Sequence, residues 1–141
     1  MGKATSADLY NQSLSHHIRG GLKGINLDAS GNLTNNLFSY KLDYENGANG
    51  LFDGNISKQS WKSNIDGKER SFDFLYDGAS RLKSGTYAST QVGENYGLNN
   101  VDYDLNGNIK ALSRSGATNT NYTAFGNVDN LTYTYQHCQN W

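Results

Sequence analysis

The chain has 141 residues, a formal net charge of −1 at pH 7 and a single cysteine. The near-neutral charge argues against a nucleic-acid-binding module, which normally carries a basic face, and one cysteine excludes an internal disulfide framework. No stretch approaches the roughly 18 consecutive apolar residues of a membrane-spanning helix. We therefore expect neither nucleic acid as a partner nor a membrane span.

Aromatic residues, glycine and asparagine give the chain its character. Tyrosine occurs ten times and phenylalanine five times, and aromatic side chains favour β-strands. There are 16 glycines and no proline, and glycine and asparagine both tolerate the left-handed backbone angles of tight hairpin turns. The composition predicts an all-β fold of short strands joined by Gly/Asn turns.

The N-terminal region has no strand pattern of its own. We expect residues 1–15 to form a lead-in that is disordered or extended, and residues 7–18 contain the one stretch with weak helical spacing. Lys3 is not followed by an apolar run, so no signal peptide is visible. The organised part is expected at 16–136, followed by a tail at 137–141.

An alternating pattern predicts strands along the organised part. Aromatic and aliphatic residues alternate with polar ones at 38–44, 71–77 and 131–136, a period of two that is typical of strands. More polar return strands are expected at 56–62, 82–89 and 109–114. Each repeat is interpreted as one antiparallel hairpin, and roughly five hairpins side by side make a curved, open sheet.

The alternation also predicts which side chains are buried. We expect the aromatic side chains of the strands to be more buried than the polar side chains between them. The aromatic set is Phe38, Tyr40, Phe72, Phe74 and Tyr76, and the polar set is Ser39, Lys41, Ser71 and Asp73.

One short phrase recurs between the strands: an aromatic or apolar residue, then Asp, a turn that contains Gly, and Leu or Ile. Asp bonds backbone N–H groups two residues on and Gly accepts a positive φ, so the phrase predicts turns at 53–55, 77–81 and 104–108. Looser copies lie at 18–22, 27–33 and 125–131. The residues that carry the three clearest copies are Asp53, Gly54 and Asn55; Tyr76, Asp77, Gly78 and Arg81; and Tyr103, Asp104, Gly107 and Asn108.

Residues that could hold a metal ion occur only in weak patterns. Asp104, Asn106 and Asn108 offer oxygens that are close in sequence, but a calcium loop of the EF-hand type needs a longer ligand series that ends in Glu. His16-His17 with His137-Cys138 has the composition of a zinc site. Adjacent residues of a strand point to opposite faces, however, so we predict no metal and no cofactor.

Catalytic patterns are equally weak. Two of the carboxylates Asp43, Glu45, Asp73 and Asp77 could be paired as in glycoside hydrolases, but positions on strand faces and in turns account for them. The sequence contains no Gly-x-Ser-x-Gly elbow and no phosphate-binding loop. We therefore predict that the chain is not an enzyme and has no catalytic residue.

The two full copies of the phrase, from Tyr76-Asp77 to Leu82 and from Tyr103-Asp104 to Ile109, resemble the YD repeats of the RHS family. The segment 50–57 and Trp61 are similar to bacterial versions, particularly those of the Bacteroidota type. The family includes the cocoon subunits of Tc toxins and the extracellular teneurins. The resemblance implies hairpins that spiral into a shell around a toxin, and a secreted or cell-surface location.

The chain departs from this family in its length and in its lack of proline. A closed shell takes more repeats than this chain has, and the family's self-cleaving region contains Asp-Pro steps that are absent here. We therefore expect a structural segment, a piece of wall or scaffold whose partners are neighbouring repeats or copies of itself. The alternative function is a module that binds glycans or a cell surface through its Tyr/Asn-rich face.

The last predicted strand, 131–136, is the expected edge for association. It contains neither proline nor a charge to block pairing with another strand, and its exposed apolar residues would be Leu131, Tyr133 and Tyr135. Head-to-tail contacts that do not close would build a filament.

Overall fold

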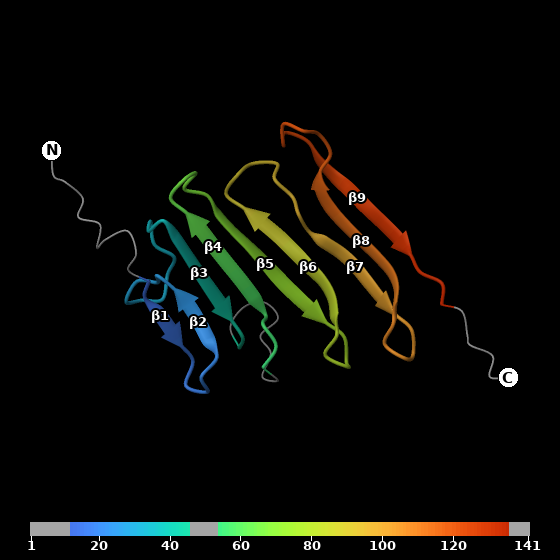
Figure 1. Cartoon of the computed structure of the whole chain (residues 1–141), viewed down its shortest axis with the longest axis horizontal. Coiled ribbons are helices and arrows are strands. Elements are labelled where there is room, and N and C mark those ends of the chain that lie inside the picture. The colour runs from blue at the N-terminus through green and yellow to red at the C-terminus, as the bar shows by residue number, and fades with distance from the viewer. Residues whose placement is uncertain (1–11, 46–53, 136–141) are drawn as a thin grey trace. The chain divides into compact units, whose positions relative to one another are not determined.

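The computed structural model of the chain describes residues 12–45 and 54–135, which form nine β-strands and no helix (Figure 1). None of the described residues therefore belongs to a helix long and apolar enough to cross a membrane. The strands are β1 (Leu14–His16), β2 (Leu22–Ile25), β3 (Phe38–Asp43), β4 (Lys58–Ser63), β5 (Glu69–Tyr76), β6 (Leu82–Ser89), β7 (Leu98–Tyr103), β8 (Ile109–Ala117) and β9 (Phe125–Thr132).

Hydrogen bonds join the strands into an open antiparallel sheet in which the strand order is the order along the chain. The prediction of an all-β fold of consecutive antiparallel hairpins is therefore confirmed. The weak helical spacing at 7–18 does not correspond to a helix in the described residues 12–18, because Leu14–His16 forms strand β1. Pairing of β1 with β2 overrides the weak local pattern. Residues 1–11 lie outside the described residues.

The chain divides into two compact units. Unit 1 consists of Met1–Asp73 and Ala88–Val92, and unit 2 consists of Phe74–Tyr87 and Gly93–Trp141. Strands β1 to β4 and most of β5 therefore belong to unit 1, and most of β6 with β7, β8 and β9 belong to unit 2.

In unit 1, strands β3, β4 and β5 form a regular ladder with an aromatic face and a polar face. Tyr40 lies opposite Trp61, and Lys41 lies opposite Ser60 on the other face. The rings of Trp61 and Phe72 stack with their centroids 5.9 Å apart on the aromatic face. The polar face carries ion pairs such as Lys58–Asp73, at 3.1 Å.

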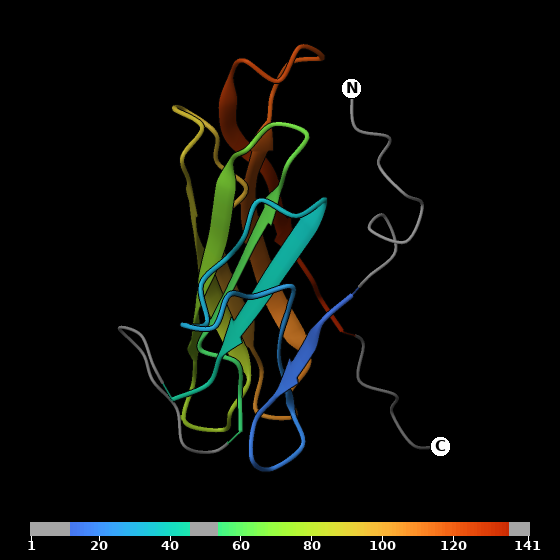
Figure 2. The ribbon, with the colours of Figure 1, turned by 90° about the vertical axis from the view of Figure 1, so that its left-hand side faces the viewer.

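The connection between β2 and β3, residues 26–37, folds back onto the polar face of unit 1 (light blue in Figure 2). The hydroxyl of Ser39 accepts the N–H of Thr34 at 3.2 Å and donates to its C=O at 3.0 Å. Leu27 lies against Gly24, where an added Cβ would come within 2.4 Å of Leu27 Cδ1 and 2.6 Å of the Tyr40 C=O oxygen. Only glycine fits at position 24, because the Tyr40 oxygen belongs to the backbone.

Asn26 fixes the start of this connection. It is only 8% exposed and adopts a φ of 54°. Its Oδ1 accepts the N–H of Ser13 at 2.9 Å, and its Nδ2 donates to the C=O of Phe38 at 2.8 Å. The C=O of Asn26 also accepts the hydroxyl of Thr34 at 2.6 Å. One buried side chain thus joins the segment before β1, the connection and the start of β3.

The expected burial of the aromatic strand residues is wrong. Ser39 is fully buried and Ser71 is buried too, whereas Phe38 is 42% exposed and the other four aromatic residues of that set are half-buried. A large ring on the aromatic face stays partly exposed, because the described part of unit 1 packs no further strand or helix over it, while neighbouring residues can cover a small serine. Among the described hydrophobic residues, only Leu42 and Val101 are buried, at 7% and 4% exposure.

In unit 2, strands β7, β8 and β9 form an antiparallel ladder (Figure 1). Val101 lies opposite Leu112, and Leu112 lies opposite Leu131. This row across three strands contains Val101, which is buried. Between the partners of Arg114 and Ser115, strand β9 has one extra residue, Val128, which forms a β-bulge.

Two predictions about the last strand are wrong. The segment 125–131 was expected to be a turn, but it forms most of β9, and the strand expected at 131–136 ends at Thr132. The preceding turn lies instead at 119–123, and pairing with β8 starts directly after it. The edge is also not free of blocking features, because β9 carries Asp129 and the bulge at Val128.

Candidate functional site: the tyrosine–aspartate turns

Four turns of the chain share one backbone pattern over five residues, called here the capped turn with positions 1 to 5. The N–H of position 1 donates to the C=O of position 5, and the N–H of position 4 donates to the C=O of position 1. Position 4 always has a positive φ, between 59° and 88°. The copies are His17–Gly21, Asp28–Asn32, Asp77–Arg81 and Asp104–Asn108.

In each capped turn, the side chain of position 1 accepts hydrogen bonds from backbone N–H groups within the turn. In the last copy, Oδ1 of Asp104 accepts the N–H of Asn106 at 2.9 Å and the N–H of Asn108 at 2.8 Å. Its Oδ2 accepts the side-chain Nδ2 of Asn108 at 2.9 Å. The same three bonds recur around Asp28, and around Asp77 with the guanidinium of Arg81 in place of the amide. This local network explains why Asp stands at position 1.

A variant of the capped turn, which sequence reasoning missed, joins β8 to β9 at 119–123. Oδ1 of Asn119 accepts the N–H of Thr123 at 3.0 Å, and its Nδ2 donates to the Thr123 hydroxyl at 2.7 Å. Tyr122 takes the positive φ, at 55°. The only sequence feature that could have revealed it is Asn at position 1, since the variant has neither Asp nor Gly.

Glycine has different jobs in the two clearest copies. Gly107 occupies position 4 with a φ of 88°, as predicted from the need for a left-handed residue. In the other copy that position belongs to Ser80, at a φ of 59°, and Gly78 stands at position 2. Gly78 therefore does not supply the positive φ expected of it.

The predicted turn at 53–55 is not a tight hairpin turn. Strand β3 ends at Asp43 and β4 begins at Lys58, so the connection between them is longer than a capped turn. Gly54 does have a positive φ, at 92°, and Asn55 follows it. Asp53 lies outside the described residues.

The turn hydrogen bonds shift the acidity of the aspartates. A side-chain hydrogen bond from Arg81, followed by backbone N–H bonds, lowers the pKa of Asp77 below its ordinary value of 3.8. The side chain and the N–H groups of the turn lower the pKa of Asp104 in the same way, and at Asp28 the backbone N–H of Asn32 is the largest cause. In each of these turns Oδ1 accepts two backbone N–H groups and Oδ2 accepts a side-chain donor, so at least three of the roughly four lone-pair sites of the carboxylate are used within the turn.

At three places a tyrosine hydroxyl at or just after the end of one strand donates to the C=O of the first residue of the preceding strand. Tyr103, directly before its capped turn, donates to the C=O of Leu82, the first residue after the preceding turn, at 2.7 Å. Tyr135 donates to the C=O of Ile109 at 2.8 Å in unit 2, and Tyr44 donates to the C=O of Leu22 at 3.0 Å in unit 1. We call Tyr44, Tyr103 and Tyr135 the anchor tyrosines. Of the three, Tyr103 begins a full copy of the repeated phrase, and its anchor bond gives the Tyr of that copy a structural role.

Arg81 makes a second link between two capped turns of unit 2. Its Nε and one terminal nitrogen bind Oδ2 of Asp77 at 2.8 and 2.7 Å. The other terminal nitrogen donates to the C=O of Asp104 at 3.3 Å, and the guanidinium carbon lies 4.5 Å from the centroid of the Tyr103 ring. One side chain thus contacts its own turn, the next anchor tyrosine and the next turn.

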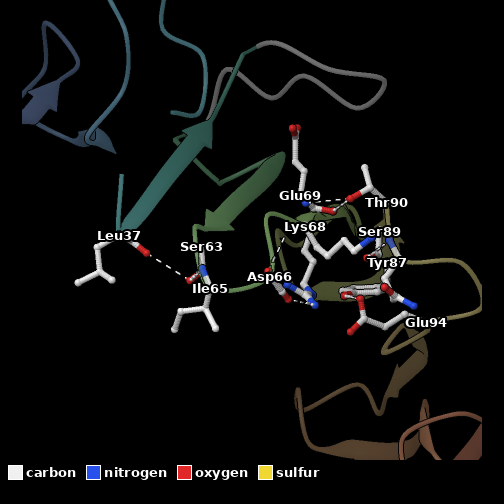
Figure 3. A network of polar contacts seen from close by, with 12 residues as sticks. Leu37, Ser63, Ile65, Asp66, Lys68, Glu69, Tyr87, Ser89, Thr90 and Glu94 are labelled. Carbon is white, nitrogen blue, oxygen red and sulfur yellow. Dashed lines mark hydrogen bonds and ion pairs between the residues drawn. The ribbon is translucent and has the colours of Figure 1, made fainter. Parts of the chain in front are cut away.

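The turn between β4 and β5 follows a different pattern (Figure 3). The N–H of Gly67 donates to the C=O of Ser63 at 2.9 Å, and Asp66 accepts the N–H of Lys68 at 3.0 Å and a guanidinium nitrogen of Arg70 at 2.8 Å. The Ser63 hydroxyl donates to the C=O of Leu37 at 3.2 Å. Capped turns with a preceding tyrosine therefore do not occur at every connection.

The other candidate residues do not assemble into a site. Asp43 pairs with Lys41 and Asp73 pairs with Lys58 on the polar face. Within residues 12–45 and 54–135, no three His, Cys, Asp or Glu side chains gather closely enough to hold a metal ion. His137 and Cys138 of the hypothetical zinc set lie outside the described residues.

One depression lies on the polar face of unit 1, with a volume of about 390 Å³ beside the turn at Asp28. Another, of about 470 Å³, is lined by Lys41, Lys58, Asp43 and Glu69 together with three uncharged residues. Its two positive and two negative side chains balance, so the depression has no net charge that would favour an anionic or a cationic ligand.

No protein-family model, curated protein or solved structure matches the chain. The likeness to YD repeats therefore rests on the residues of the repeated phrase.

Proposed function

We propose that the chain is a structural repeat segment of the YD/RHS type, whose hairpins are tied side by side into a wall or scaffold outside the cell or on its surface. The observation that supports this function is the bond from an anchor tyrosine to the first residue of the preceding strand, found in both units. Such bonds hold neighbouring strands together and so stiffen the sheet. They do not position a reactive side chain for chemistry.

Binding of glycans is the alternative function. Aromatic rings such as Trp61 and Phe72 on the aromatic face of unit 1 could stack on sugar rings, and Gln59 on the same face offers an amide. Tyr40 and Gln59 are already joined by a hydrogen bond of 3.1 Å, however, and the rings stack on one another. These contacts favour cross-strand packing, which stabilises the sheet by about 0.2–1 kcal/mol per pair.

Tyr103→Phe tests the structural proposal. The change removes the hydroxyl that donates to Leu82 and keeps the ring below Arg81. We expect a loss of about 1 kcal/mol, and hence about fivefold faster amide hydrogen exchange around Leu82 and Tyr103. The control is Tyr96→Phe, because the Tyr96 hydroxyl makes no hydrogen bond in the described part of the chain.

The two functions predict opposite results in a second measurement. Unchanged exchange in Tyr103→Phe, together with glycan-array binding that is lost on Trp61→Ala, would replace the structural function by the binding function. Faster exchange confined to Tyr103→Phe, with no glycan bound, is the result that the structural function predicts.

A further inference from the structure

Strand β9 is the last strand in the sheet order of the described residues. In an edge strand, the backbone N–H and C=O groups of every second residue point away from the neighbouring strand, here β8. The N–H of Tyr133 donates to the C=O of Lys110 at 2.8 Å, so the backbone groups of Tyr133 point toward β8. Antiparallel pairing alternates, and the register is continuous from Asp129 to Thr132. The N–H and C=O groups of Asn130 and Thr132 therefore point outward, and both residues are exposed.

The bulge limits how far another strand can pair along this edge. Upstream of Asp129, the extra residue Val128 breaks the alternation and increases the local twist. A regular outer ladder is therefore confined to residues 129–133. This short segment differs from the long, featureless edge that would support a continuous filament.

We propose that residues 129–133 of β9 pair with the same residues of a second copy of this chain, antiparallel and related by a two-fold axis through Leu131. In this register Asn130 lies opposite Thr132 of the second copy, and their outward N–H and C=O groups satisfy one another. The inference deepens the proposed structural function, on which it rests, by naming the partner of the edge.

The side chains of this register are self-complementary. Leu131, which is 42% exposed, lies opposite Leu131 of the second copy in a pair without hydrogen bonds, where side chains come closest. Asp129 lies opposite Tyr133 of the second copy, so the Tyr133 hydroxyl can donate to a carboxylate oxygen. Asp129 already pairs with Arg114, which keeps its charge compensated at the edge.

A two-fold contact of this kind uses the same patch on both copies and closes on itself. The edge of β9 therefore predicts a dimer and not the open filament expected from the sequence. A third copy cannot add to β9, because the pairing uses the outward groups of both strands.

Analytical ultracentrifugation of the full chain at micromolar concentration tests the association. We expect a concentration-dependent species of twice the 15.5 kDa chain mass. Thr132→Pro should leave a folded monomer, because proline removes an outward N–H that makes no bond to β8. If the wild-type chain is a folded monomer at these concentrations, or if Thr132→Pro keeps its folded circular dichroism spectrum and still dimerises, the proposed pairing is wrong.

A charge swap at Leu131 tests the register itself. Leu131→Lys and Leu131→Glu should each be monomeric, since two like charges would face each other across the axis, and an equimolar mixture should restore the dimer. Dimers that persist in both separate variants, or a mixture that stays monomeric, would overturn the two-fold register. Tyr103→Phe reports on the hairpin anchors independently, so the structural function can hold while the dimer fails.

Discussion

Both units use capped turns, but they differ in what else holds their hairpin connections. In unit 1 the connection from β2 to β3 contains the capped turn Asp28–Asn32, but it also folds back over the sheet and is held there by one buried residue, Asn26, which makes four hydrogen bonds to Ser13, Phe38 and Thr34. In unit 2 the connection from β7 to β8 is a capped turn that stays exposed and depends on many local bonds around Asp104. The connections of a sheet can thus rely on one central buried residue or on repeated local caps.

The comparison predicts that single changes are most damaging in unit 1. Asn26→Ala leaves the N–H of Ser13 and the C=O of Phe38 without partners, and it places alanine at a φ of 54°. We expect a loss of about 3 kcal/mol in the free energy of unfolding, measured by urea denaturation. Asn36→Ala is the control, since Asn36 is exposed in the same connection and its side chain makes no hydrogen bond in the described part of the chain. Similar losses in both variants would mean that Asn26 is not the central residue.

In unit 2, single changes should act through the backbone of the capped turns. Gly107→Ala forces a side chain into a φ of 88°, which should cost about 1–2 kcal/mol. Gly78→Ala meets open space and has no positive φ, so it should stabilise the chain by about 0.4–1 kcal/mol. Urea denaturation midpoints that shift in opposite directions would support the assignment of position 4, and a loss from Gly78→Ala would contradict it.

The sequence predicted the local features of this fold well. Period-two alternation found the cores of β3 and β5, and the repeated phrase found the turns at Asp77 and Asp104, because strand faces and capped turns each depend on residues within one short segment. The turn at His17 was harder to recognise, since His16-His17 stands where the later copies have Tyr-Asp.

Features that depend on distant residues could not be predicted. Ser39 is buried by Thr34 and the rest of a connection that folds over the sheet. No sequence pattern around Ser39 predicts this burial. The segment 125–131 contains the Gly and Asn typical of a turn, but it forms a strand because it pairs with β8. The anchor bonds link residues more than 20 positions apart, and the sequence gives only their donor, the tyrosine.

The smallest expected effect is a loss of stability of the Asp-capped turns at low pH. This effect also distinguishes them from the turns that have no aspartate at position 1. The pKa of Asp28, Asp77 and Asp104 lies below 3.8 in the folded chain. A carboxylate with a lowered pKa contributes stability that is fully present above its unfolded value and lost as the pH falls through the folded value. We therefore expect the turns at these residues to loosen below about pH 4.

Measuring turn amide shifts by NMR between about pH 5 and pH 2 would show this change at the N–H groups that bind the carboxylates. The variant Asp104→Asn keeps an oxygen at position 1 but has no proton to gain, so Asn106 and Asn108 should lose their acid response there. The turn at 119–123 provides a control within the same chain, because Asn119 already caps it without a carboxylate. An equal acid response at Thr123 and Asn108 would show that the sheet as a whole loosens in acid and that the capped turns do not titrate individually.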